Sequence, residues 1–569
     1  MYGSTSKGNE FPFGRIVSQS TSSSAGAVVR CPCWKLGTPE RYLYDVSVTE
    51  QHENVLTADA VVVGGGHNGL IAAAYLARAG VSTVLIEARD EVGGCASTVT
   101  DLGARFNICN CDHTMIRALP VFDDLELSRH GLRYLEAEFS SIHSSYQPDS
   151  TWVFRHNPEE HLDTLNTTHP QWVKAYRSYL NDALPVAHLI IEMARTTPSS
   201  ARFLQRVALM KGRGARRLLA WSKLSAQEVY EQYFDDWRIW MPAIVTGPTV
   251  WGVHPATPGT GLAGALYATK HLLRTARPEG GSGALTDAIH RSFTAAGGQT
   301  VTGSRVVKLH THGQRVNGVE LADGRKISTE HVLASNDPLQ IFTQWLKGSD
   351  VEDAGAVSRW RTQPVHDGYE SKLDLVIDGL PVYRFEERLR SHVGQSDLHT
   401  PTTVISPSPD DLEEAHRRRL VGGIADRPSM LINIPTNLDS TMQLDPTEHV
   451  LSLEVLFTPY QHDWSQTTEP ERWLHILDSL CEPGTLKVKR WRAMTPDRYE
   501  QEFFMPRGHT PAYAGSPLAT FQGRPQDLTR HRGPIEGLHL AGAAAFPGAG
   551  IFGGAGRNAA HRVLANLGK

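Results

Sequence analysis

The sequence has no uninterrupted apolar run that approaches 18 residues, so it predicts no membrane-spanning helix. Six cysteines in 569 residues are too few for a disulfide-stabilised extracellular scaffold and favour a reducing compartment. Neither sign of charge dominates, because the formal net charge is only -5, and this gives no electrostatic case for a nucleic-acid partner. These absences favour a cytoplasmic protein, and a hydrophobic content of 40% suits a folded soluble chain.

Residues 1–57 differ in composition from the rest of the chain. Met1–Val28 is rich in serine and glycine and lacks the apolar segment of a secretory signal. Glu10 is the only acidic residue before Arg30, which leaves an organellar transit peptide open as an alternative. Because basic residues are few and no amphipathic period is present, we expect residues 1–57 to form a mobile extension.

A glycine-rich turn follows the first strand predicted after this extension. The β-branched run Ala58–Val63 leads into the sequence GGGHNGL and a helix predicted over Leu70–Ala79. Gly64 would allow the tight turn, Gly66 the approach of a pyrophosphate, and Gly69 close packing of helix on strand. The helix start would direct free amides at the phosphates. The candidate cofactor-binding residues of this turn are Gly64, Gly66, Asn68 and Gly69.

The next residues discriminate between dinucleotides. After a second predicted strand, Val81–Ile86, Glu87 falls where an acidic side chain accepts hydrogen bonds from a ribose. The E-x-R-x-x-x-G-G continuation resembles flavoproteins of the glutathione reductase and amine oxidase type, and nicotinamide dehydrogenases do not ordinarily carry it. Arg89 would neutralise phosphate charge. We therefore predict FAD, with contacts from Glu87, Arg89, Gly93, Gly94 and Cys95.

A second glycine-rich segment, Gly548–Asn558, lies close to the C-terminal end of the sequence. It follows a predicted strand that enters a turn over Gly537–Gly542, and it precedes a helix predicted from Gly553 to Leu567. The helix start would face an anion. Its GxGxxG spacing suggests a separate nicotinamide nucleotide site, but no strand with an acidic residue follows, and we reject that interpretation.

These motifs resemble the phytoene desaturase-like branch of FAD-dependent oxidoreductases, and more narrowly the pyridine nucleotide-disulfide oxidoreductase domain-containing protein 2 group. The likeness extends over Ala58–Leu567, and its segments are 64–70, 124–132, 278–285, 336–338 and, most specifically, 548–560. It implies that Val306 brings backbone groups to the adenine. It also implies that Gly542, Gly550 and Ile551 lie at the flavin N1–C2 carbonyl edge, where negative charge develops upon reduction.

The predicted fold class is α/β, with a Rossmann-like doubly wound FAD-binding domain and an inserted α+β substrate domain. The length exceeds what one hydrophobic core usually serves. The discontinuous FAD-binding domain is expected over 58–160, 275–345 and 500–569, and the substrate domain over 160–275 and 345–500.

The first part of the substrate domain is helical in pattern and carries a basic segment. A capping box is predicted at Ser225–Glu228. Upstream, basic residues are interleaved with Phe203, Leu204, Val207, Leu209, Leu218, Leu219 and Trp221; they are Arg202, Arg206, Lys211, Arg213, Arg216, Arg217 and Lys223. The pattern fits a solvated helical hairpin, and it also fits peripheral contact with an anionic membrane, especially if the substrate is lipophilic.

The segment Phe106–His113 follows the double glycine and should approach the ring side of the flavin. If it is extended, Cys109, Cys111 and His113 share one face, with Asp112 on the other. Three interpretations stay open: ordinary packing, acid–base groups on the substrate side, or a metal or covalent-flavin site. The C-x-C-x-H pattern lacks the two-pair spacing of zinc sites, and no metal is expected. The candidate catalytic residues are His113, Cys111, Asp112 and His509, with His254 as a further acid–base candidate.

The sequence therefore predicts an FAD-dependent oxidoreductase that takes a hydride from a small or lipophilic organic substrate. Electrons would leave to oxygen, a quinone or another acceptor, since no second nucleotide site is expected. Two alternatives stay open. One is a non-redox isomerase that requires reduced FAD, and the other is a non-catalytic, FAD-stabilised binding protein. No pattern in the sequence fixes the oligomeric state.

Overall fold

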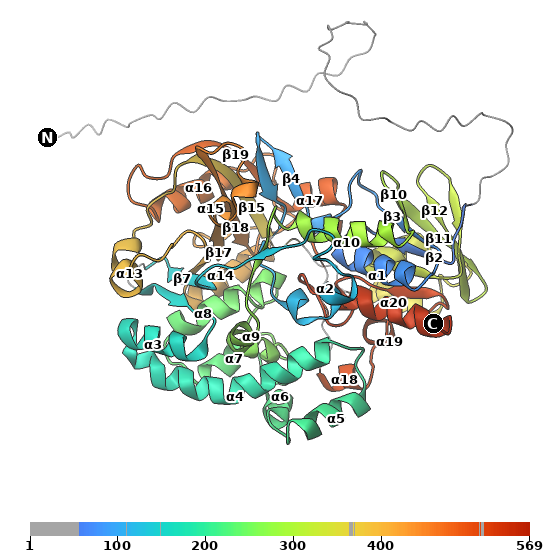
Figure 1. The fold of residues 1–569 in the computed structure, drawn as a ribbon, viewed down its shortest axis with the longest axis horizontal. Helices are drawn as coiled ribbons and strands as arrows, with labels where there is room; N and C mark the ends of the chain where they lie inside the picture. Colours follow the sequence, from blue (N-terminus) through green and yellow to red (C-terminus); the bar gives the residue numbers. More distant parts are fainter. Residues whose placement is uncertain are drawn as a thin grey trace, which may run out of the picture. The chain divides into compact units, whose positions relative to one another are not determined.

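The computed structural model (Figure 1) describes residues 56–569, except 110, 148–149, 364–367, 369, 511–512 and 514–516. The extension predicted over residues 1–57 lies outside this part, apart from its end at β1 (Leu56–Thr57). Within the described part, no helix is both long and apolar enough to cross a membrane.

A five-stranded parallel sheet, ordered β10-β3-β2-β14-β20, carries the first glycine-rich turn and the approach to the second segment. Its strands are β2 (Ala60–Val63), β3 (Thr83–Ile86), β10 (Gln299–Val301), β14 (Val332–Ala334) and β20 (Leu538–Leu540). The carboxyl ends of β2, β14 and β20 lie next to one another, because these strands are parallel neighbours in register. The strands predicted at Ala58–Val63 and Val81–Ile86 are confirmed.

Three helices cover one face of this sheet: α1 (His67–Arg78), α10 (Gly283–Ala295) and α20 (Gly554–Asn566). Alternate strand residues serve the two faces. Val62 and Leu85 pack under the helices, whereas their neighbours Val61 and Val84 pack on the opposite side. All of these side chains are buried, as expected for strands covered on both faces. The helices predicted after both glycine segments are confirmed.

The opposite face packs against a second sheet, ordered β1-β13-β12-β11. Its three longer strands, β11 (Val306–His312), β12 (Arg315–Leu321) and β13 (Lys326–Ser328), form an antiparallel meander. This is the β excursion that the alternating residues after Arg305 predict. Val306 is buried at the start of β11, where it pairs with Leu321.

A seven-stranded mixed sheet, ordered β19-β15-β18-β17-β16-β7-β8, forms the other large element (Figure 1). Its strands are β7 (Ser141–Ser145), β8 (Trp152–Phe154), β15 (Glu370–Asp378), β16 (Thr402–Ser406), β17 (Met430–Asn433), β18 (Glu448–Leu456) and β19 (Val488–Met494). All neighbours are antiparallel except β16 and β7. The sheet predicted around Val450–Phe457 is confirmed.

In the sequence, helices fill the region that follows β8, as predicted for 160–275. They are α3 (Pro158–Thr168), α4 (Pro170–Ala194), α5 (Ser200–Leu209), α6 (Ala215–Trp221), α7 (Ala226–Glu231), α8 (Trp237–Val245) and α9 (Leu266–Leu272). The capping box is present at the start of α7: Ser225 accepts from the Glu228 amide, and the Glu228 side chain accepts from the Ser225 amide. An aromatic core with Trp152 and Tyr176 joins these helices to the sheet.

The seven-stranded sheet includes two strands from the N-terminal part of the described chain. β7 and β8 lie inside 58–160, yet they join the seven-stranded sheet, where β7 runs parallel to β16. The pairing is between strands more than two hundred residues apart, and local sequence pattern does not encode it. The domain boundaries at 160, 275, 345 and 500 stay predictions.

Candidate functional site

In the first glycine turn, an added Cβ would fit at one position and would clash at two others. Gly64 has φ +93°, and a Cβ there would lie 2.4 Å from Ser335 Oγ. A Cβ at Gly69 would lie 1.9 Å from the Gly64 carbonyl oxygen, so helix α1 starts against the turn itself. Gly66, by contrast, would meet nothing within 4 Å. The backbone at Gly66 therefore borders open space at the start of α1.

Glu87 lies beside this turn at the end of β3. Its buried carboxylate accepts hydrogen bonds from the Gly65 amide at 2.6 Å and from the Arg89 amide at 2.9 Å. The carboxylate keeps further acceptor capacity, since each oxygen carries two lone pairs. Ser304 donates its amide to the Glu87 carbonyl at 2.9 Å, so the chain that leads into Val306 runs directly alongside.

The double glycine returns the chain to the first turn. Gly93 pairs with Gly66 in an isolated parallel bridge, and the Gly93 amide donates to the Gly65 carbonyl at 2.8 Å. A Cβ at Gly94 would lie 3.1 Å from the Gly66 Cα. The Arg89 guanidinium lies 4.3 Å from the centre of the Phe503 ring. Residues 64–66 and 93–94 thus form one backbone surface.

The second glycine-rich segment meets the first one directly. A Cβ at Gly556 would lie 2.0 Å from the Asn68 carbonyl oxygen, and the Gly556 amide donates to Asn68 Oδ1 at 3.4 Å. A Cβ at Gly553 would lie 2.5 Å from Ile71 Cδ1. The starts of α1 and α20 are therefore in contact through glycine, although nearly the whole chain separates them in sequence.

The His67 side chain strengthens this contact. Burial lowers the pKa of His67 to about 4, and a hydrogen bond to the Gly550 backbone acts in the opposite direction. The next residue, Ile551, accepts a hydrogen bond from the Ile116 amide at 3.1 Å. Gly542 packs against Ser335, where a Cβ would lie 2.5 Å from the carbonyl oxygen. The predicted residues of both segments are thus brought to one place.

The residues at this junction fit a bound dinucleotide. Gly66 and Gly553 occupy the N-cap positions of α1 and α20, so neither helix start is capped by its own side chain. No acidic residue lies in either first turn, which leaves the positive end of each helix dipole available to an anion. Among the described residues, His67 Nε2, Asn336 Oδ1 and Asn558 Nδ2 are buried without hydrogen-bond partners.

Helix α10 provides a contrast, because protein side chains occupy its start. Asn107 Oδ1 accepts from the Ser282 amide at 2.9 Å, and Thr98 Oγ1 accepts from the Gly283 amide at 2.9 Å. The start of α10 is therefore satisfied by the chain itself and is not an anion site.

The segment after Asn107 is not extended, so the prediction that alternate residues share one face does not apply. Its side chains diverge: Asp112 binds Arg277 at 2.7 Å and Thr402 at 2.6 Å, whereas Cys111 Sγ lies 3.6 Å from Asn433 Oδ1. Burial acts to raise the pKa of Asp112, but Arg277 and the hydrogen bond from Thr402 together outweigh burial, and the pKa lies below its usual value. Burial raises the pKa of Cys111 to about 12.

His113 is fully enclosed beside the glycine junction. Its Nδ1 lies 3.0 Å from the Tyr134 hydroxyl and its Nε2 lies 3.3 Å from Ser282 Oγ. Burial lowers the pKa of His113 to about 3, and nearby His67 lowers it further. Both ring nitrogens have neutral partners, an arrangement that positions the ring as a neutral imidazole.

The two other histidines lie elsewhere. His254 pairs with Glu413 at 2.8 Å and contacts the His416 ring, on the helical side of the seven-stranded sheet. His509 is buried and follows Gly508, where a Cβ would lie 2.4 Å from the Pro496 carbonyl oxygen. The catalytic roles suggested for His113, Cys111, Asp112 and His509 stay predictions. No group of three or more metal-ligating side chains is positioned for a metal in the described part of the chain.

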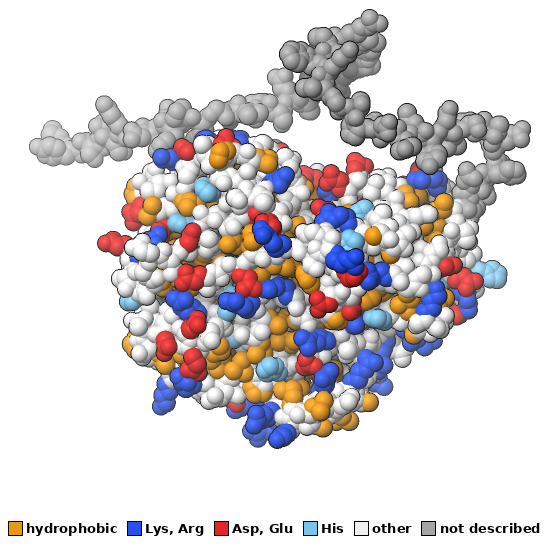
Figure 2. Space-filling model, viewed as in Figure 1, with side chains coloured by type: hydrophobic (Ala, Val, Ile, Leu, Met, Phe, Trp, Pro, Cys, Tyr) orange, Lys and Arg blue, Asp and Glu red, His pale blue; other side chains and the backbone are white. Residues whose placement is uncertain are grey.

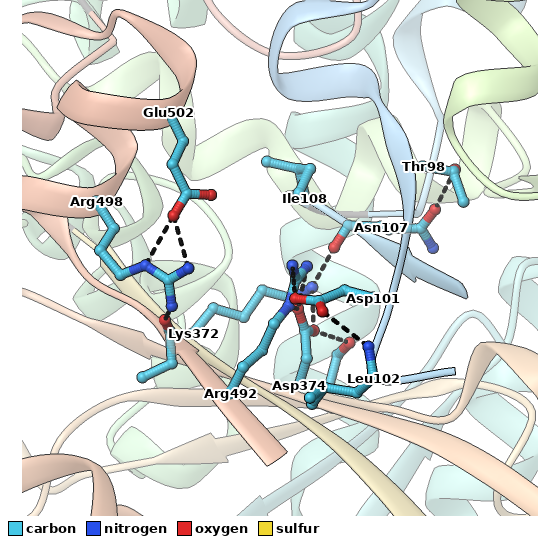
Figure 3. Close-up of polar contacts among 12 residues, drawn as sticks. Thr98, Asp101, Leu102, Asn107, Ile108, Lys372, Asp374, Arg492, Arg498 and Glu502 are labelled. Carbon is cyan, nitrogen blue, oxygen red and sulfur yellow. Dashed lines mark hydrogen bonds and ion pairs between the residues drawn. The ribbon is translucent and has the colours of Figure 1, made fainter. Parts of the chain in front are cut away.

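A row of buried charged residues on β15 faces the segment that carries Asn107 (Figure 3). Lys372 Nζ donates to the Asn107 carbonyl and lies 2.6 Å from Asp374 Oδ1. Asp374 Oδ2 also binds Arg492 at 3.0 Å, and Arg492 continues to Asp101 at 3.0 Å. Lys372 and Asp374 are 1% and 0% exposed. This network fixes the seven-stranded sheet to the chain that leaves the double glycine.

Two carboxylates complete this charged face. Glu454, on β18, is directly opposite Lys372, and Glu370 begins β15. Burial raises the pKa of Glu454, and the negative charge of Glu370 raises it further. Burial likewise raises the pKa of Glu370, while a hydrogen bond from Cys109 acts in the opposite direction. Glu454 Oε1 is buried and has no hydrogen-bond partner among the described residues.

The sequence interpretation missed these residues, although a signal was present. Glu370, Lys372 and Asp374 alternate with Ser371 and Leu373, so charge recurs at every second position of a strand. A strand with one solvated face explains such a period, but here both faces are buried. Charge with period two in a covered strand indicates a polar cavity wall or a buried network.

Comparison with known proteins agrees with this geometry. Residues 62–124 match the family model described as an NAD(P)-binding Rossmann-like domain. The chain is 30% identical over 558 residues to pyridine nucleotide-disulfide oxidoreductase domain-containing protein 2 of Rattus norvegicus, covering 90% of this chain and 94% of that protein. It is 24% identical over 518 residues to the lycopene-forming phytoene desaturase of Pantoea ananas, covering 86% of this chain and 96% of that protein.

Solved structures share the fold. Putrescine oxidase with bound putrescine superimposes with a TM-score of 0.59 at 17% identity, covering 90% of this chain and 100% of that chain. The predicted fold class, α/β with a Rossmann-like dinucleotide-binding part, is confirmed.

Proposed function

Because the chain belongs to the family of pyridine nucleotide-disulfide oxidoreductase domain-containing protein 2, an oxidoreductase family, we propose that it binds FAD and oxidises a C–H bond of a small or lipophilic organic substrate. The observation that carries the proposal is the direct contact between the glycine-rich starts of α1 and α20. Such a contact supports one dinucleotide held from both sides. The reoxidant proposed is oxygen or a quinone-like acceptor.

Each end of the cofactor would have its own set of residues. Backbone amides at Gly66 and the start of α1 would hold the pyrophosphate, and Glu87 would accept hydrogen bonds from the ribose. Arg89 would add positive charge near the phosphates. The start of α20, with Gly550 beside it, would face the flavin ring. When bound, FAD would supply the two-electron acceptor for the oxidation.

We propose Glu454 as the group that takes up the substrate proton. Dehydrogenation removes two electrons and two protons from the substrate; a hydride carries one proton and both electrons, so the second proton needs an acceptor beside the substrate. Glu454 Oε1 is buried, lacks a partner among the described residues and lies opposite Lys372. Burial and the negative charge of the nearby Glu370 raise the pKa of Glu454 above the usual carboxyl range. A pKa closer to neutral pH suits a general base. The role of Lys372 is then to orient the carboxylate and to stabilise its charge.

Glu454→Gln is expected to lower kcat/KM by about 100-fold or more, the usual contribution of a general base. In the wild type, kcat/KM should rise with pH through the raised pKa of Glu454, because only the carboxylate accepts a proton. The variant should lose this ascending limb. The matched control is Glu448→Gln. Glu448 lies at the other end of β18, where it is paired with Arg490. An unchanged pH profile in Glu454→Gln would exclude this role.

Anaerobic bleaching tests the reaction class. We expect a substrate to bleach the flavin absorbance without added reductant, and amines, alcohols and alkenes of increasing chain length form the panel to screen. Turnover only after prior reduction of the flavin would instead establish the non-redox isomerase. Binding of ligands without any redox change across the panel would favour a binding protein and would contradict the proposal.

A further inference from the structure

Helices α5 and α6 form an exposed hairpin with apolar side chains on its surface. No residue of α5 is buried, and Leu204 and Leu209 are 65% and 66% exposed. On α6, Leu219 is 40% exposed. Large apolar side chains gathered on one surface element indicate an interaction site rather than scattered exposure. An open depression of about 410 Å³ lies between α4 and α5, bordered by Leu209 and Met210 and by His188, Glu192 and Arg206.

The same hairpin is strongly basic. The sequence has no acidic residue between Glu192 and Glu228, while seven lysines and arginines lie between Arg202 and Lys223. Two of the seven are neutralised by α4, since Arg206 binds Glu192 at 3.1 Å and Arg217 binds Asp182 at 2.7 Å. The remaining positive charge is exposed on the same hairpin as the leucines; it comes from Arg202, Lys211, Arg213, Arg216 and Lys223.

The hairpin is nevertheless held firmly to the body of the protein. The Phe203 ring stacks on Phe521 with centres 3.9 Å apart. At the turn, a Cβ on Gly214 would lie 2.6 Å from the backbone of Pro185, so this glycine permits direct contact with α4. The exposed leucines therefore belong to a docked element whose inner side is already packed. Figure 2 shows basic and apolar side chains side by side at the lower edge of the view, where Figure 1 places α5 and α6.

We propose that this α5–α6 surface docks on an anionic lipid bilayer. Exposed cations interleaved with protruding leucines match a membrane interface, where headgroup charge lies directly above the acyl boundary. An acidic protein surface would pair with the cations, but it would not offer the leucines an apolar layer to enter. The inference does not depend on which substrate the protein oxidises.

Co-sedimentation of the full-length protein with vesicles tests the proposal. We expect binding to vesicles of phosphatidylcholine with phosphatidylglycerol, little binding to phosphatidylcholine alone, and loss of binding at high salt. Arg213→Gln/Arg216→Gln should weaken partitioning roughly five-fold for each cation removed. Leu204→Gln/Leu209→Gln should weaken it by at least about ten-fold at unchanged net charge, because two apolar anchors are lost.

A matched control exists at the end of α14 (Pro409–Arg419). Leu420 and Val421 are 67% and 83% exposed beside arginines, but Arg418 is paired with Glu414 and Asp426. Leu420→Gln/Val421→Gln should therefore bind vesicles as the wild type does. Equal binding by the Leu204/Leu209 variant and the wild type would overturn the proposal. Binding that depends on the cations alone would do so as well, because the leucines would then not enter the bilayer.

Discussion

Gly66→Ala is expected to lower FAD affinity at least about ten-fold, or 1.4 kcal/mol, while the apo-protein stays as stable as the wild type. A methyl group at Gly66 would meet no protein atom within 4 Å, and its φ of -70° suits alanine. The space it enters is the approach to the start of α1, where the pyrophosphate backbone would lie. The added methyl group would therefore clash with ligand and not with protein.

Gly69→Ala is the matched control, because it should lower the stability of the apo-protein. Its Cβ would lie 1.9 Å from the Gly64 carbonyl oxygen, so overpacking should cost about 1–3 kcal/mol of folding free energy. Thermal unfolding of both apo-variants and titration with FAD separate the two effects. Wild-type FAD affinity in Gly66→Ala would show that the open face of this turn does not contact the cofactor.

Asp374→Asn is expected to lower the free energy of unfolding by about 3–5 kcal/mol, because it leaves two cations, one of them buried, without their shared carboxylate. Lys372 and Arg492 both bind Asp374; Lys372 and Asp374 are buried, and the Arg492 side chain is 9% exposed. Ser452, which donates to Asp374 Oδ1 at 2.9 Å, would keep a partner in the amide oxygen. The loss of stability should therefore come from the removed charge of Asp374 and not from a broken hydrogen bond to the Ser452 hydroxyl.

Lys372→Met/Asp374→Leu provides the comparison. Replacing both members of a buried pair by apolar residues of similar size is often close to neutral. The double variant should thus be more stable than Asp374→Asn alone, as urea unfolding of all three proteins would measure. A double variant less stable than the single one would mean that the network stabilises the fold outright.

The sequence predicted the dinucleotide-binding half well because its signals are local. A β-branched strand, a turn that requires glycine and a helix start lie within twenty residues, and each has its own physical cause. The same holds for α20, where Gly553 precedes the helix. What local pattern could not provide is the contact itself: Gly556 lies against Asn68 only because β20 and β2 flank β14.

The substrate side was harder to predict for the same reason. Glu454 faces Lys372 through the register of two strands some eighty residues apart, and Arg492 reaches Asp374 from a third. The segment with His113 also departed from its expected form. It leaves the strand at Asn107 and gives each polar side chain a different partner, so the alternation of a strand did not apply. Tertiary partners, not spacing, decide which groups share a cavity.

The absorption spectrum of the purified full-length protein, recorded before and after denaturation, tests most directly whether both glycine segments hold one FAD. We expect a flavin spectrum in the native protein and the mass of FAD in the fraction released by denaturation. A flavin that stays attached to the chain would identify a covalent link and direct attention to the cysteine and histidine residues after Asn107. A preparation that contains no flavin and binds none when FAD is added would refute the shared FAD site.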